Sequence, residues 1–579
     1  MRHFVEKVTF GHTAPRPNDS ARRTRRESSV EDPLWWRSAV IYQVYIRSFA
    51  DGDGDGTGDL TGVRAHLGYL RDLGVDALWF TPWYASPLAD GGYDVADYRQ
   101  IHPAFGTLAD AETLITEALD YGIRTIIDVV PNHVSDRHPW FQAALAAGPG
   151  SPERERFWFR PAAAEMPNHW VSNFSGDTWT RTTNADGTPG EWYLHLFTPE
   201  QPDLNWNHPD VRREHEEILK FWFDRGVAGV RIDSAALLVK DAALPEVPQH
   251  PAPGQHPNTD RDELHDIYRS WRSVADSYAG TRVLVGEIWL PDIDRFAMYL
   301  RSDELHTAFN FDFMARPWNA SELRESIDAT LAAHAPVGAP STWVLSNHDV
   351  TRPVTRYGRQ DSSFAFATKR VGTPTDLELG TRRARAAALL SAALPGSLYI
   401  YQGDELGLPE VEDIPHDRLQ DPMHFRSGGL DPGRDGCRVP LPWRGIRSPF
   451  GFSPEPAAAG SAAAEPWLPQ PAAWAELTVQ AQQSDPSSML WLYREALRVR
   501  RREPGLGDGP LTWLHSQPDV LAFSRGDSFL NVTNLSQAPL ELPEHLSILL
   551  SSSPLNAGLL PPDSTAWLRT SSQPREKRP

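Results

Sequence analysis

Four short segments spaced along the chain each end in side chains that can carry out acid–base chemistry. They are Asp128-Val-Val-Pro-Asn-His133, Gly229-Val-Arg-Ile-Asp233, Gly286-Glu287-Ile-Trp289 and Ser346-Asn-His-Asp349. In each segment an apolar run stops at an acidic, basic or imidazole side chain. Such a run is typical of a buried parallel strand, and catalytic groups of (β/α)8 barrels lie at the carboxyl ends of the strands. Three carboxylates presented in this way, those of Asp233, Glu287 and Asp349, are the groups that cleavage of a glycosidic bond requires.

The second segment places an arginine beside an acid. Arg231 and Asp233 are two residues apart on one predicted strand, so both side chains point to the same face. We expect the guanidinium to lower the pKa of Asp233 and keep it ionised, as a nucleophile requires. A single Asp at a strand end is usually a cap or turn residue, and a single His is usually structural. Four such segments together favour a catalytic interpretation.

The elements between these segments predict a closed barrel. Apolar strand-like runs alternate with amphipathic helical patterns, which is typical of repeated βα units. The predicted strands are 39–49, 77–82, 124–130, 228–232, 282–288, 307–313, 342–346 and 397–401, and helical patterns cover 108–121, 210–225, 262–278, 381–394 and 488–502. Eight strands favour a (β/α)8 TIM barrel. A doubly wound open sheet is the alternative, but no Gly-x-Gly-x-x-Gly follows the first strand.

Two further domains are predicted from the spacing of the elements. Residues 134–204 are far too long for an ordinary βα loop and are predicted to form an inserted domain B. Short alternating stretches at 506–570 predict a C-terminal antiparallel β domain, resembling a β-sandwich. The barrel then comprises 31–133 and 205–505, and we expect disordered tails at 1–30 and 571–579.

The composition limits the classes of partner. The 579 residues carry a formal net charge of −20, which disfavours nucleic acid and anionic membranes. Small neutral oligosaccharides remain suitable ligands. Cys437 is the only cysteine, so no intramolecular disulfide can form, and no apolar stretch is long enough for a membrane span. Because the N-terminal segment also lacks the layout of a signal peptide, we expect a cytoplasmic protein, as a monomer or small homo-oligomer.

The four segments also resemble, in order and wording, the conserved regions of the α-amylase family of glycoside hydrolases (family 13). The resemblance covers roughly residues 33–505 and is greatest to exo-acting α-glucosidases of the oligo-1,6-glucosidase-like branch. It implies that Asp233 is the nucleophile, which forms a covalent glucosyl intermediate and is held in position by Arg231. Glu287 would be the general acid and then the base, and Asp349 would bind sugar hydroxyls. No cofactor is expected for catalysis.

The same resemblance implies a set of substrate-binding residues. Asp128, His133 and His348 match positions that contact the glucose at subsite −1, and Tyr93 matches an aromatic residue that stacks on it. Asp94 and Arg352 match the pair that closes the pocket around a non-reducing end in exo-acting members. A buried arginine–carboxylate fork there would exclude longer chains.

A glycine- and aspartate-rich loop follows the first predicted strand. Its oxygen-bearing residues occupy alternate positions, as hard divalent cations require, and are Asp51, Asp53, Asp55, Thr57 and Asp59. The loop departs from an EF-hand, because Gly62 stands where a bidentate Glu is needed. Members of the oligo-1,6-glucosidase-like branch carry a similar loop that binds Ca2+ or Mg2+, with the Thr57 position offering its backbone carbonyl. A structural cation is therefore expected, and an acidic turn without metal is the alternative.

One residue, at the position after the predicted nucleophile, bears on which glycosidic linkage the enzyme would cleave. In the branch, Val after the nucleophile correlates with α-1,6 activity and Thr with α-1,4 activity, whereas this chain has Ser234. A small hydroxyl is closer to Thr, so we expect an α-1,4-glucosidase acting on maltose and short maltooligosaccharides, with transglucosylation open. The alternatives are an oligo-1,6-glucosidase and a sucrose- or trehalose-type glucosyltransferase or isomerase. A non-catalytic transporter subunit is disfavoured because the three acids are present and no membrane helix is predicted.

Overall fold

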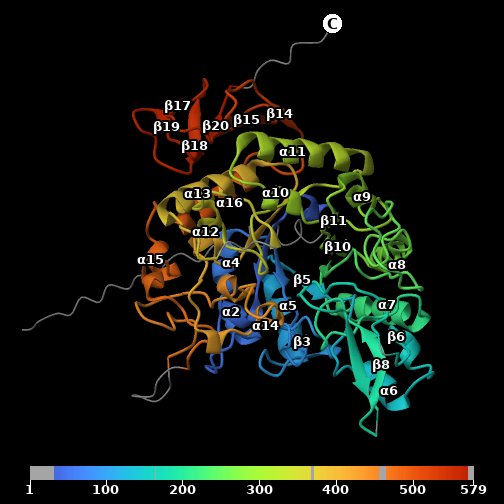
Figure 1. Cartoon of the computed structure of the whole chain (residues 1–579). Helices are drawn as coiled ribbons and strands as arrows, with labels where there is room; N and C mark the ends of the chain where they lie inside the picture. Colours follow the sequence, from blue (N-terminus) through green and yellow to red (C-terminus); the bar gives the residue numbers. More distant parts are fainter. Residues whose placement is uncertain (1–31, 164, 185, 367–370, 456–463, 572–579) are drawn as a thin grey trace, which may run out of the picture.

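The centre of the molecule is one parallel sheet of eight strands. The computed structural model describes residues 32–571, apart from 164, 185, 367–370 and 456–463, so the predicted tails lie outside the described residues except for Ser571. The strand order is β11-β10-β9-β5-β2-β1-β13-β12. Figure 1 shows β10, β11 and β5 in the middle of the molecule, with helices around them. The strands are β1 (Val40–Val44), β2 (Ala77–Phe80), β5 (Arg124–Val129), β9 (Gly229–Ile232), β10 (Val283–Gly286), β11 (Thr307–Ala308), β12 (Thr342–Val344) and β13 (Ser397–Tyr401). The predicted (β/α)8 fold is confirmed.

The barrel closes at a seam between the first and last strands of this order. Within the described residues, β11 pairs only with β10 and β12 only with β13. Across the seam the hydroxyls of Thr307 and Thr342 form a hydrogen bond, and the backbone N–H of Asn310 donates to the carbonyl of Thr342 at 3.3 Å. The seam is therefore held by isolated contacts instead of a strand ladder.

Helices surround the sheet and bury one face each. They include α3 (Leu60–Ala65), α4 (Leu67–Leu73), α5 (Leu108–Asp120), α7 (Pro209–Phe223), α8 (Leu264–Asp276), α9 (Ile293–Met298), α11 (Ala320–His334), α13 (Leu377–Ala393) and α16 (Met489–Arg502). Local sequence fixes their ends: Thr107 and Asp110 form a capping box at α5, and Asp376 caps α13. α13 stops before Pro395, as expected from the missing N–H of proline.

Two predicted strands are shorter than expected because helices replace their ends. Residues 39–49 form β1 and then α2 (Ile46–Phe49), which buries Ile46 and Phe49 from a helix instead of a strand. Residues 307–313 form β11 and then α10 (Phe311–Ala315). The Asn310 side chain accepts a hydrogen bond from the N–H of Phe313 at 2.9 Å, which caps α10 and ends the apparent strand alternation.

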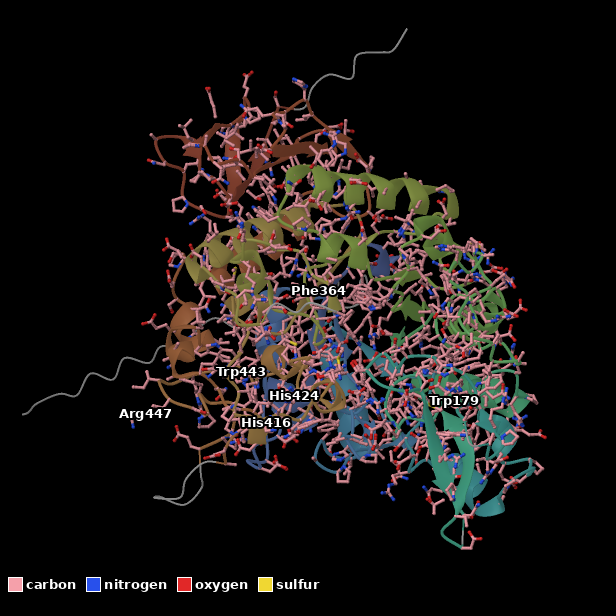
Figure 2. The ribbon with its side chains drawn as sticks, viewed as in Figure 1. Trp179, Phe364, His416, His424, Trp443 and Arg447 are labelled. Atoms are coloured by element: carbon pink, nitrogen blue, oxygen red, sulfur yellow. The ribbon has the colours of Figure 1, made fainter. Side chains whose placement is uncertain are left out.

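The long insertion after β5 folds around its own tryptophan core. It contains α6 (Pro139–Ala147) and a three-stranded antiparallel sheet in the order β6-β8-β7, formed by β6 (Phe159–Arg160), β7 (Trp179–Thr183) and β8 (Pro189–Leu194). Its core comprises Trp158, Trp170, Trp179, Leu194, Leu196 and Leu244, and Figure 2 shows Trp179 at the β7–β8 hairpin. Leu244 comes from the loop after β9, so a segment outside 134–204 completes this domain.

The C-terminal region packs on the outside of α13. Its five-stranded antiparallel sheet has the order β14-β15-β16-β20-β18, with β14 (Leu511–Trp513), β15 (Val520–Arg525), β16 (Phe529–Asn534), β18 (Ser547–Ser551) and β20 (Ser564–Arg569). β17 (Leu540–Glu541) and β19 (Leu559–Leu560) form a second, two-stranded sheet. Trp567 and Arg525 donate to carbonyls of α13, at Leu389 and Ala393. Among the described residues, no helix is long and apolar enough to cross a membrane.

Candidate active site

Three carboxylates from three neighbouring strands share one guanidinium group at the carboxyl ends of the barrel strands. Arg231 on β9 contacts Asp128 at 3.0 Å, Asp233 at 2.8 Å and Glu287 at 2.9 Å. The guanidinium is fully buried, so the four groups interact in a low-dielectric environment. The strand ends thus place the predicted nucleophile and the predicted acid against the two terminal nitrogens of Arg231.

The expectation that the pKa of Asp233 is lowered overall is wrong, although Arg231 acts in the expected direction. Burial, together with the charges of Glu287 and Asp128, raises the pKa of Asp233 well above its ordinary value, although Arg231 alone would lower it. Burial also raises the pKa of Asp128 to about 7. The reason is charge balance: one cation cannot neutralise three carboxylates. A single proton held within the cluster relieves this repulsion.

Asp349 has the opposite environment. Its Oδ1 atom contacts Arg434 at 3.1 Å and Arg438 at 2.9 Å, and its Oδ2 atom lies 3.4 Å from His348. Although burial opposes the effect, these contacts hold the pKa of Asp349 below its ordinary range. Asp349 is therefore a fixed anion on the wall of the site opposite Arg231.

A hydrogen-bonded chain fixes the predicted glucose-binding side chains. The Gln43 amide contacts Nδ1 of His348 at 2.6 Å, and Nε2 of His348 contacts the Tyr93 hydroxyl at 2.7 Å. That hydroxyl donates to Oδ2 of Asp128 at 2.8 Å. The rings of Tyr93 and His348 lie parallel, with centroids 5.3 Å apart. Burial lowers the pKa of His348 well below its ordinary value, so the imidazole is neutral and Nε2 carries its proton.

A second wall is formed by Gln201 of the inserted domain and by His133, the barrel residue that directly precedes that domain. The Gln201 amide donates to Oδ2 of Asp90 at 3.1 Å and lies 3.0 Å from Nε2 of His133. Burial lowers the pKa of His133 to about 3, so it is uncharged. Lys240, after the nucleophile strand, binds Asp203 at 2.8 Å inside the protein and holds the inserted domain against the barrel.

The predicted pair of Asp94 and Arg352 does not form. Asp94 accepts hydrogen bonds from Ser86 and from the backbone of residues 89 and 90, and Arg352 donates to the carbonyls of Gln402 and Cys437. Both side chains are buried and form hydrogen bonds with the loops around them. They do not contact each other.

The ion pair at this wall is instead formed by Asp90 and Arg434, which lie 2.6 Å apart. Asp90 is four residues before Asp94 in the same motif, so that motif contributes an ion pair through a different acid than predicted. Arg434 also binds Asp421 at 2.7 Å. The sequence prediction missed Arg434 and Arg438 because they lie in a glycine-rich loop without strand periodicity. The only signal there was two arginines beside the single cysteine, in Arg434-Asp-Gly-Cys-Arg438.

Ser234 occupies a strained position between the two catalytic candidates. Its φ is 47°, in the left-handed region that residues other than glycine rarely adopt. This conformation directs its backbone N–H at Oε2 of Glu287, at 2.8 Å. The residue after the predicted nucleophile therefore orients the predicted acid with its backbone.

The aspartate-rich loop brings together three of its four predicted carboxylate ligands. Asp51, Asp53 and Asp59 each offer a carboxylate oxygen, and these oxygens lie within 4.8 Å of one another. Asp55 is not part of this group, and its carboxylate accepts the N–H of Thr57 at 2.7 Å. Gly56, at a φ of 93°, makes the turn that a side chain would strain. The donor set fits a hard divalent cation.

Comparisons with known proteins agree with this geometry. Residues 43–509 match the family model described as "Alpha amylase, catalytic domain". The oligo-1,6-glucosidase of Parageobacillus thermoglucosidasius is 33% identical over 560 residues, covering 89% of this chain and 93% of that protein. A probable alpha-glucosidase of Rhizobium meliloti (strain 1021) is 34% identical over 515 residues, covering 85% and 87%.

Solved structures of related enzymes superpose on the whole of the described fold. An alpha-glucosyl transfer enzyme is 32% identical with a TM-score of 0.79, covering 93% of this chain and 99% of that one. The isomaltulose synthase from Klebsiella sp. LX3 is 28% identical with a TM-score of 0.80, covering 93% and 100%. Enzymes that hydrolyse and enzymes that transfer glucosyl groups are thus both among its similar proteins.

Proposed function

Because the chain belongs to the α-amylase family of glycoside hydrolases, we propose that it is a retaining exo-α-glucosidase. It removes terminal non-reducing α-1,4-linked glucose from maltose and short maltooligosaccharides through a covalent β-glucosyl-enzyme intermediate. The observation that carries the proposal is the single guanidinium of Arg231, which contacts Asp233 at 2.8 Å and Glu287 at 2.9 Å. Two carboxyl groups bound to the two terminal nitrogens of one guanidinium lie close together, which supports retention, because retaining enzymes hold their two carboxyl groups about 5–5.5 Å apart.

The mechanism follows from the charge balance of the site. In the proposed mechanism Asp233 attacks the anomeric carbon as a carboxylate, and Glu287 carries the proton that the leaving group receives. Glu287 gives its proton to the glycosidic oxygen as the aglycone leaves, and Asp233 is then bonded to glucose. A water molecule attacks the same carbon, Glu287 takes its proton, and Asp233 is released as a carboxylate. Asp349, held ionised by Arg434 and Arg438, favours the positive charge that develops on the sugar.

The exo mode is supported by the wall that Asp90 and Arg434 form. Their 2.6 Å ion pair lies next to Asp349 and blocks extension of the sugar chain beyond the non-reducing glucose. Both side chains are buried, so opening the wall would expose an uncompensated charge. A long glucan could then enter only by its terminal residue.

Initial rates on maltose and isomaltose, with every product resolved by chromatography, test the proposal. Glucose released much faster from maltose would support the α-1,4 assignment and the permissive role of Ser234. A preference for isomaltose would overturn the linkage. One side chain separates such substrates by about 1–3 kcal/mol, so a difference of roughly 10–200-fold is expected.

Transfer is the second candidate function, because two of the similar structures are an alpha-glucosyl transfer enzyme and an isomaltulose synthase. The same covalent intermediate can be attacked by a sugar hydroxyl instead of water. Rearranged disaccharides without net hydrolysis, from maltose or from sucrose, would favour this function. The ratio of glucose to disaccharide product separates the two candidates.

We also propose a structural cation in the aspartate-rich loop, held by Asp51, Asp53 and Asp59. Such an ion would neutralise carboxylates that lie close together and would stabilise the loop between β1 and α3. The loop does not contain any of the groups around Arg231, so the ion has no part in the reaction.

A further inference from the structure

The candidate acid is held by two hydrogen bonds and one ion pair from different elements. On Oε2, Glu287 accepts from the N–H of Ser234 at 2.8 Å and lies 2.9 Å from Nη2 of Arg231 in an ion pair. On Oε1 it accepts from the indole Nε1 of Trp289 at 3.1 Å. Because Oε2 faces the Ser234 N–H and the Arg231 cation, Oε1 is the better placed of the two oxygens to carry the proton, and Oε1 is the oxygen that Trp289 contacts.

The indole that makes this contact is itself fixed in place. The Trp289 ring stacks on Phe311 with ring centroids 3.8 Å apart and an angle of 8° between the planes. Phe366 packs against it at 4.9 Å and 67°, and Phe364, labelled in Figure 2, supports Phe366 at 5.1 Å. Phe311 is the first residue of α10, whose start is capped by Asn310. Trp289 is thus positioned by a helix outside the strands that carry the acids.

We propose that Trp289 is a positioning residue that fixes the direction in which Glu287 presents its proton. The proposal rests on the function proposed above and adds a residue to it. The indole N–H occupies one lone pair of Oε1, which leaves the other side of that oxygen for the O–H bond. Since the terminal torsion of a glutamate is broad, the carboxyl group would otherwise turn about its last bond. Trp289 removes that freedom and directs the proton toward the glycosidic oxygen.

The rival role for Trp289 is a flat wall on which the departing sugar stacks. Trp289 is 36% exposed, which is enough for a sugar to reach it. The two roles differ chemically, because a wall needs only the ring whereas orientation of the acid needs the N–H. Trp289→Phe retains an aromatic ring against Phe311 and removes the donor, so it separates them.

The test compares two substrates whose leaving groups differ in their need for acid. Maltose leaves as a sugar alkoxide and requires the proton, whereas 4-nitrophenyl α-glucoside leaves as a stable phenolate and requires little help. For Trp289→Phe we expect kcat/KM on maltose to fall about tenfold, the size of one lost hydrogen bond to a charged group. On the aryl glucoside we expect a change of less than about twofold. kcat/KM is the right quantity because it covers substrate binding and the step in which the aglycone leaves, and it does not depend on the later hydrolysis of the intermediate.

Two further variants complete the experiment. Phe311→Leu retains the donor but loosens the ring, so it should lower kcat/KM on maltose by a smaller factor than Trp289→Phe does, and it should change kcat/KM on the aryl glucoside less. Trp289→His offers a ring N–H from a smaller ring, so its kcat/KM on maltose should fall less than that of Trp289→Phe. This variant keeps the test possible if Trp289→Phe folds poorly.

Each outcome bears on one claim. Equal losses on maltose and the aryl glucoside, or no loss on either, would overturn the role of Trp289 and leave the proposed function intact. A wild-type enzyme that cleaves neither substrate would overturn the proposed function and this inference with it.

Discussion

Asp233 and Asp349 have opposite balances of charged neighbours. Asp233 shares one guanidinium, that of Arg231, with two other carboxylates, whereas Asp349 contacts two guanidinium groups, those of Arg434 and Arg438. Arg434 also binds Asp90 and Asp421. The pKa of Asp233 is raised by burial and by its acidic neighbours, whereas the pKa of Asp349 is lowered despite burial. Burial is common to both acids, so the balance of charged neighbours decides the direction.

This difference assigns a task to each half of the site. A cluster with too few cations holds a proton and can pass it on, which suits a nucleophile and an acid that change their protonation during each turnover. A cluster with sufficient cations keeps its carboxylate ionised throughout, which suits a group that stabilises positive charge. The predictions below alter one cluster at a time.

The largest effect is expected from removing the nucleophile. Asp233→Asn leaves the shape of the Arg231 cluster unchanged but removes the attacking oxygen anion, so kcat on maltose should fall by at least ~10³-fold. Circular dichroism and thermal unfolding check that the variant is folded, and Asp303→Asn, on the surface near α9, is the matched control. Substantial residual hydrolysis would contradict the assignment of Asp233.

The next effect concerns the arginines around Asp349. Arg434→Lys keeps a positive charge but cannot contact Asp90, Asp421 and Asp349 together, because an ammonium lacks the planar fork of a guanidinium. We expect kcat/KM on maltose to fall roughly 10–50-fold and the ratio of rates on maltotetraose to maltose to rise. Arg316→Lys, on α10, is the control; an unchanged ratio would show that the wall does not select chain length.

A smaller effect is expected in the pH dependence of kcat/KM when the carboxylates around Arg231 are changed. The charge of Asp128 raises the pKa of Asp233, so Asp128→Asn should lower that pKa. Because Asp233 must be ionised to attack, the acid limb of kcat/KM against pH should move to lower pH by about half a unit. The overall rate will also fall, since Asp128 holds Tyr93, but only the position of the limb is diagnostic. An acid limb that stays in place would mean that Asp128 does not influence the nucleophile.

The smallest effect concerns the aspartate-rich loop, which is a third acidic cluster. Among the described residues, no arginine forms an ion pair with its carboxylates. A chelator should release the proposed ion from the group of Asp51, Asp53 and Asp59 and lower Tm by about 2–4 °C. Addition of Ca2+ or Mg2+ in excess should restore Tm, and Asp53→Asn should abolish the response. An unchanged Tm would indicate that the loop binds no ion.

The sequence predicted the barrel and its acids because both follow from local patterns. β-branched runs that stop at Asp128, Asp233 and Glu287 identify buried strands, and the common edge of a parallel sheet brings their ends together. The inserted domain was predicted from the length of one connection. The helical starts at Ile46 and Phe311 were missed because a capped helix can follow a strand without a break in the apolar pattern.

The features of the site that the sequence did not predict depend on contacts between distant loops. Arg434 and Arg438 reach Asp349 from a loop some 85 residues further along the chain, and no periodic pattern marks such a residue. The pKa of Asp233 was misjudged for the same reason: the sequence shows Arg231 beside it but not that Asp128 and Glu287 share that arginine. Charge balance is a property of the assembled site.

The seam between β11 and β12 has a consequence for how this enzyme can diversify. β11 is two residues long and forms a ladder with only one neighbour, and it leads directly into the helix that carries Phe311. β10, the neighbour of β11, ends next to Glu287, and the Phe311 ring stacks on Trp289, which contacts that acid. The strands that end next to Asp128 and Asp233 are β5 and β9, and each of them is paired on both sides. Substitutions along the seam can therefore change the setting of the acid while the nucleophile keeps its place.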